Sequence, residues 1–171
     1  NHWLHVLCTP LLTFFAIHLN RGKAAIQAIG IIPKFTGWLM HDFLSSYLGY
    51  ENCLHTFCKS HLLRELVFLF EQHKQSWAKD LYDLFLEMLQ WVKDCKTRDA
   101  PLTEKEFRVW RSKYRKILKA GRQANPLTPQ QCAKKRPKQS KAQNLLDRLQ
   151  GFDNCILAFL WEPDLPFTNN E

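Results

Sequence analysis

The hydrophobic pattern of this 171-residue chain changes its period near residue 58, and that change limits the folds the chain can adopt. Before it, apolar residues come in short runs rich in aromatic and aliphatic side chains, which is typical of strands. After it, apolar residues recur three and four positions apart, which is typical of amphipathic helices. Strands followed by helices predict an α+β protein, or a mixed sheet that carries a helical insertion.

Short elements are predicted before residue 58, because turn-forming residues interrupt every apolar run. The predicted elements are strands at 2–8 and 11–18 that form a hairpin around Thr9-Pro10, a helix at 22–29 stopped by Gly30, a buried strand at 37–42, a helical turn or two at 43–48, and a strand at 53–57.

Four helices are predicted after residue 58 from the spacing of the apolar residues. They cover 62–70, 77–91, a segment from Thr103 to Gly121, and 145–160. Thr103 with Glu106 three residues later is a capping box, which marks a helix start. Three prolines within 123–138 exclude a long helix there and indicate a loop.

Membrane insertion and secretion are not expected, although residues 1–20 carry no Asp, Glu, Lys or Arg. The longest apolar run, Leu11 to Ile17, is far shorter than the ~20 residues of a spanning helix. A cationic start and a small-residue cleavage site, as in a signal peptide, are absent. Six unevenly spaced cysteines favour a reducing compartment. We therefore expect a soluble protein of the cytoplasm.

The positive charge of the chain is concentrated in one segment. Residues 102–150 hold 14 basic and 3 acidic side chains, whereas residues 1–101 hold 10 and 9. A one-sided cationic segment on a nearly neutral body is typical of a nucleic-acid contact, because neutralised phosphates release counterions. The alternative is a solvated helix face that only aids solubility.

Asp42 closes the predicted strand at 37–42 and is the only acidic residue among the first 50. A carboxylate at a strand end can bind a hard cation such as Mg²⁺ through oxygen. An aspartate in this position is also a common helix cap. Phosphoryl transfer with two metal ions needs several converging acidic groups, so Asp42 alone does not make a catalytic site.

Four zinc-type ligands lie within nine residues: Cys53, His55, Cys58 and His61. Zinc prefers sulfur and imidazole ligands, so a zinc site is one hypothesis. The other is a pair of buried thiols with a hydrogen-bonded histidine that fixes the strand-to-helix turn.

Five strings of residues, in order along the chain, resemble the catalytic region of bacterial transposases of the insertion sequence 66 family. They are Arg21-Gly22-Lys23, the run from Ala28 to Gly37 with His41-Asp42 after it, Cys58 to Leu66, Lys138 to Leu149, and Pro166 to Asn170. The resemblance runs from about residue 2 to the last residue.

The resemblance implies a partial ribonuclease-H-like mixed sheet with a large helical insertion. Residues 1–61 would be part of the catalytic core, 62–137 a helical insertion with a basic loop, and 138–171 a helix returning towards the core. It also implies a DDE transposase, in which three acidic residues bind two Mg²⁺ ions for DNA cleavage and strand transfer. Cys58 and His61 would be a structural C-x-x-H pair.

Asp42 would be the second of the three acids. The resemblance places the first before residue 2 and the third two residues beyond Glu171, so we expect this chain alone to be inactive. Glu171 is not counted as the third acid, because a shift of two positions along a helix turns a side chain by roughly 200°.

DNA is the expected partner, with a homo-oligomer and accessory transposition proteins, in the bacterial cytoplasm. The predicted contact surface is the stretch from Lys105 to Lys141 together with Arg148. Arg64, from the predicted helix at 62–70, is added to this surface. The residues predicted to contact DNA are therefore Arg64, Lys134, Lys135, Arg136, Lys138, Lys141 and Arg148. The alternatives are a zinc-stabilised, non-catalytic helical module that binds nucleic acid or protein, and a plain helical scaffold.

Overall fold

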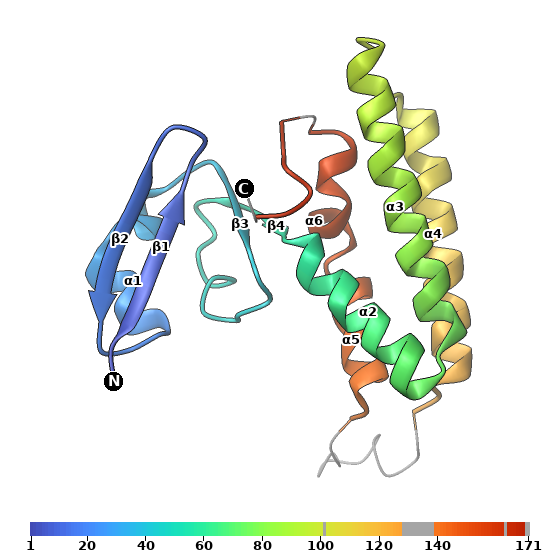
Figure 1. Cartoon of the computed structure of the whole chain (residues 1–171), viewed down its shortest axis with the longest axis horizontal. Helices are drawn as coiled ribbons and strands as arrows, with labels where there is room; N and C mark the ends of the chain where they lie inside the picture. Colours follow the sequence, from blue (N-terminus) through green and yellow to red (C-terminus); the bar gives the residue numbers. More distant parts are fainter. Residues whose placement is uncertain (101, 128–138, 163, 170–171) are drawn as a thin grey trace. The chain divides into compact units, whose positions relative to one another are not determined.

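The computed structural model describes residues 1–100, 102–127, 139–162 and 164–169 (Figure 1). The chain divides into two compact units, Asn1–His55 and Thr56–Glu171. Strands and helices are both present, so the predicted α+β class is confirmed. A single mixed sheet is not found: in the described part of the chain, β1 pairs with β2 and β3 with β4, which gives two separate two-stranded sheets.

The predicted hairpin at the start of the first unit is confirmed. Strands β1 (Trp3–Cys8) and β2 (Thr13–His18) are antiparallel, and Trp3 lies opposite His18. The hydroxyl oxygen of Thr9 accepts hydrogen bonds from the N–H groups of Leu11 (3.3 Å) and Leu12 (3.0 Å). This threonine therefore satisfies backbone donors that the tight turn leaves without a ladder partner.

Helix α1 (Lys23–Ile29) follows the hairpin as predicted and ends at Gly30. Gly30 has φ 76°, a left-handed conformation that glycine adopts at little cost, and its N–H donates to the Ile26 carbonyl. The 3-10 helix η1 (Ile32–Lys34) continues from there with Pro33 in its first turn.

Strand β3 (Trp38–His41) pairs with β4 (Leu54–Phe57), and the division between the two units falls within β4. The core of the first unit is a small cluster of buried residues packed against half-buried neighbours. Its buried members are Ile26, Ile32, Tyr50 and Cys53.

The predicted helical turn at 43–48 is instead a series of tight turns. Its backbone bonds join residues three apart, such as Tyr47 N–H to the Leu44 carbonyl and Leu48 N–H to the Ser45 carbonyl. The side chain of Asp42 accepts the N–H of Leu44 at 3.0 Å, which starts the first turn in place of a helical bond.

The second unit is helical, and its described helices pack in a cycle in which the last long helix returns to the first (Figure 1). They are α2 (Lys59–His73), α3 (Ser76–Thr97), α4 (Glu104–Ala124) and α5 (Lys141–Gly151), followed by the short α6 (Asp153–Leu157) and η3 (Ala158–Leu160). The apolar stripes predicted from the sequence face inward. Their fully buried side chains include Leu62, Leu66, Leu81, Phe85, Met88, Leu145 and Leu149.

Helix α4 begins at the predicted capping box but does not end at Gly121. A Cβ atom on Gly121 would lie 2.8 Å from Leu146 Cδ2 and 2.9 Å from Trp77 Cδ2. The glycine therefore lets α4 pass close to its neighbours, which is a tertiary requirement rather than a stop signal.

The predicted single helix at 145–160 is broken after Gly151. Phe152 has φ −120°, outside the helical range, and its ring packs edge-on against Phe57 at 5.4 Å. Asp153 then begins α6, and its carboxylate is held by the guanidinium groups of Arg111 and Arg115 on α4. These contacts, distant in sequence, reorient the chain at the weak helix former Gly151.

Candidate functional site

Asp42 directly follows β3, as predicted, and its carboxylate is partly exposed. One carboxylate oxygen accepts the N–H of Leu44, and the other lies 3.6 Å from the guanidinium of Arg21. That guanidinium also lies 5.5 Å from the centre of the Trp3 ring. The turn that follows β3 therefore presents Asp42 at the surface of the first unit, and Arg21 limits its free negative charge.

His41 lies immediately before Asp42 and is buried. Its Nε2 is 3.0 Å from Nδ1 of His55, its Nδ1 contacts the Asp42 carbonyl, and Nε2 of His55 is 3.0 Å from the Tyr50 carbonyl. Burial lowers the pKa of His41 to about 4 and outweighs its hydrogen bond to the Asp42 carbonyl, so His41 is neutral at pH 7. The contact between His41 and His55 thus joins the last residue of β3, next to Asp42, to β4.

Metal-binding geometry is incomplete in the described residues. No group of three or more His, Cys, Asp or Glu side chains there is arranged to hold a metal ion. Asp42 is a single carboxylate beside a cation, so it does not form a magnesium site without further ligands. In the first unit, Cys53 Sγ lies 3.9 Å from His55 Nε2, and burial raises the pKa of that thiol. The predicted zinc site gains no support from this geometry.

Cys58, the first residue of the C-x-x-H pair, lies in contact with the segment that begins at Pro166, within the second unit. Cys58 is the residue before α2, and its sulfur contacts the Ser60 hydroxyl at 2.9 Å and the Asn169 N–H at 3.4 Å. The next N–H, from Lys59, donates to the Phe167 carbonyl at 3.1 Å. Burial raises the pKa of Cys58, but these hydrogen bonds and those of His61 outweigh it and lower the pKa to about 7. Cys58 and the backbone of Lys59 thus tie residues 167–169 to the start of α2.

Sequence reasoning missed the burial of Lys59. This lysine is fully buried: its ammonium donates to the Thr56 hydroxyl at 3.3 Å and lies 4.9 Å from the centre of the Phe159 ring. Burial lowers its pKa from 10.5 to about 7, although Cys58 and Cys155 partly oppose that change. No local pattern separates this lysine from the exposed lysines of other helix starts.

Three of the predicted DNA-contacting residues come together between α2 and α5. Arg64, Lys141 and Arg148 line one cavity of about 500 Å³ with His61, Glu65, Phe68, Leu69 and Asn144. The structure does not describe Lys134, Lys135, Arg136 and Lys138. The DNA contacts of all seven residues remain a prediction.

Several arginines of α4 are engaged within the protein. Arg111 and Arg115 bind Asp153, Arg122 binds Asp147, and Arg108 binds Glu104. The lysines of the same helix, such as Lys116 and Lys119, are exposed. Charge counting in the sequence therefore overstates the free positive charge on this helix.

Two further features of the described residues concern disulfides and membrane-spanning helices. The cysteines Cys8, Cys53, Cys58, Cys95 and Cys155 are free thiols. No helix in the described part is long and apolar enough to cross a membrane.

The protein-family model described as "Transposase IS66 family" matches residues 1–171. No curated protein and no solved structure shows significant similarity to the chain.

Proposed function

Because the chain belongs to the IS66 family of transposases, we propose that it is part of a DNA transposase that cleaves DNA and joins the cut end to a target. The single observation that carries this proposal is the family match along all 171 residues. The mixture of strands and helices is compatible with the ribonuclease-H-like catalytic fold that we propose for the complete protein.

Asp42 is the carboxylate that we assign to the catalytic acids of this enzyme. Its place after β3, its exposure, and its fixed orientation by Leu44 and Arg21 support the assignment. Magnesium would supply the Lewis acidity for phosphoryl transfer in such an enzyme. Since Asp42 is one carboxylate, activity requires further acidic ligands, and the assignment rests on position rather than on a complete site.

DNA contact by the basic segment completes the proposal. A transposase binds the ends of its element and a target, and counterion release by lysines and arginines favours both. We also assign to the complete protein a homo-oligomer, accessory proteins and a place in the bacterial cytoplasm, as the family resemblance implies.

The test is the transposition frequency of the element that encodes this protein, measured with Asp42→Asn. Asparagine keeps the acceptor for the Leu44 N–H but removes the charge, so the fold is expected to survive while transposition is lost. Glu51→Gln is the matched control, because Asp42 and Glu51 are the two acidic residues of the unit Asn1–His55. Transposition that continues at the wild-type frequency with Asp42→Asn would remove Asp42 from the catalytic set.

A further inference from the structure

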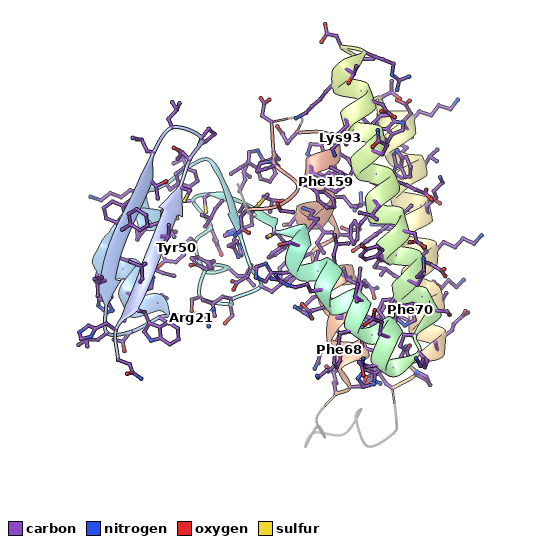
Figure 2. All side chains as sticks on the ribbon, in the orientation of Figure 1. Arg21, Tyr50, Phe68, Phe70, Lys93 and Phe159 are labelled. Carbon is purple, nitrogen blue, oxygen red and sulfur yellow. The ribbon has the colours of Figure 1, made fainter. Side chains whose placement is uncertain are left out.

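The cavity between α2 and α5 combines positive charge with a carboxylate that opposes it. Arg64, Glu65 and Phe68 come from α2, whereas Lys141, Asn144 and Arg148 come from α5. Phe68 lies four residues after Arg64 and three after Glu65, and Asn144 lies three residues after Lys141 and four before Arg148, so neighbouring side chains of each helix line the same groove. Figure 2 labels Phe68 on α2.

The three cations of this groove are not equivalent. The two terminal guanidinium nitrogens of Arg148, Nη1 and Nη2, donate to the carboxylate of Glu65, with Nη1 to Oε1 at 3.1 Å, so the carboxylate compensates that positive charge. The ammonium of Lys141 lies 4.0 Å from the centre of the Phe68 ring, which orients it, and no ion pair of Lys141 is found in the part of the chain that the structure describes. Arg64 is exposed and has no ion-pair partner among the described residues.

We propose that this groove holds a backbone phosphate of DNA between Arg64 and Lys141, and that Glu65 weakens the site by occupying Arg148. The inference rests on the proposed function, since that function supplies DNA as the ligand. Charge complementarity carries the choice of occupant, because two uncompensated cations face one cavity large enough for a phosphodiester and its sugar.

Phosphate recognition also accounts for the residue types that line the groove. The guanidinium of Arg64 can donate two parallel hydrogen bonds to phosphate oxygens, while Lys141 acts as a point charge. The amide of Asn144 adds a neutral donor. None of these contacts reads a base, so the site should bind unrelated DNA sequences equally.

The test measures the binding of the full chain to a fluorescently labelled DNA duplex by anisotropy at several salt concentrations. Arg64→Gln and Lys141→Gln each remove one phosphate contact. Each should lower the slope of log K against log salt by about 0.9 and weaken binding about eightfold at 0.1 M salt. Lys141→Arg keeps the charge and should bind like the wild type, which separates loss of charge from loss of fold.

Glu65 gives the opposite expectation. Glu65→Gln removes the carboxylate that opposes the charge of Arg148, so binding should tighten and the salt slope should steepen by about 0.9. Arg148→Gln exposes the carboxylate of Glu65 and should weaken binding, whereas the double variant Glu65→Gln with Arg148→Gln should return close to the wild type. A Glu65→Gln affinity equal to that of the wild type would overturn the role of Glu65.

Lys93→Gln is the matched control, because Lys93 is exposed on α3 away from the groove (Figure 2). Its affinity should change by less than about twofold. If the wild type binds DNA with the expected salt dependence but Arg64→Gln and Lys141→Gln behave like Lys93→Gln, the groove is not the site and the proposed function stands. If the wild type shows no salt-dependent binding to DNA, both proposals fail.

Discussion

Replacing Lys59 with methionine should stabilise the protein at neutral pH. The ammonium of Lys59 is fully buried, and its side chain accounts for one hydrogen bond, to the Thr56 hydroxyl. That hydroxyl in turn donates to the Cys155 carbonyl at 3.1 Å, so Thr56 keeps a partner when the lysine is removed. Methionine has nearly the length of lysine without the charge, and it can pack against the Phe159 ring.

The size and pH dependence of the effect follow from the pKa of Lys59, which burial lowers from 10.5 to about 7. Between these two values the unfolded chain binds more protons than the folded one, so the wild type gains stability as pH rises from 7 to 10.5. Each pKa unit corresponds to about 1.4 kcal/mol, which gives a cost of about 4 kcal/mol at pH 7. The titratable groups that face the ammonium, Cys58 and Cys155, reduce this cost as they ionise.

Lys59→Met should therefore raise the free energy of unfolding by about 2–4 kcal/mol at pH 7, or the melting temperature by roughly 5–15 °C. The gain should shrink towards zero near pH 10.5. Thermal unfolding followed by circular dichroism at pH 7 and pH 10 measures both values, with Lys93→Met as the exposed control. A gain of equal size at both pH values, or a loss at pH 7, would refute the argument from desolvation.

Two further predictions concern packing and acid stability. Gly121→Ala should lower the free energy of unfolding by about 1 kcal/mol, because the steric cost of its Cβ against Trp77 and Leu146 exceeds the gain in helix propensity. Gly151→Ala is the control: a Cβ there has open space, so urea titrations should show an unchanged or higher free energy of unfolding. Burial lowers the pKa of His41 to about 4, so the unfolded chain binds more protons than the folded chain between pH 6.5 and pH 4. The free energy of unfolding of the wild type should therefore fall by up to about 3 kcal/mol as the pH is lowered over that range. A His41→Gln variant that shows the same fall would contradict this assignment.

The periodic helices could be predicted from the sequence because their apolar residues report burial directly. The stripe from Trp77 to Trp91 lies within α3, and the capping box at Thr103 begins α4. The errors occur where a distant contact decides the local structure. Gly121 continues a helix because Trp77 and Leu146 need the space, and the chain breaks at Phe152 because Phe57, Arg111 and Arg115 hold that region.

The candidate site shows the same limit. The position of Asp42 after a strand follows from the local pattern, but its neighbour Arg21 is separated from it by 20 residues and by a helix. The pairing of Arg148 with Glu65 joins residues 83 apart, so a count of charges cannot show that this guanidinium is compensated. Lys59 has no local sign of burial, because lysine at a helix start is ordinarily solvated.

The division of the chain at His55 has a consequence for every one of these measurements. Two compact bodies with cores of their own need not melt together, so a single midpoint can hide two transitions. Acidification acts on the body that contains His41, whereas Lys59→Met acts on the other. Variants that retain a single tryptophan, either Trp38 in the first body or Trp77 in the second, would report by fluorescence which one has opened.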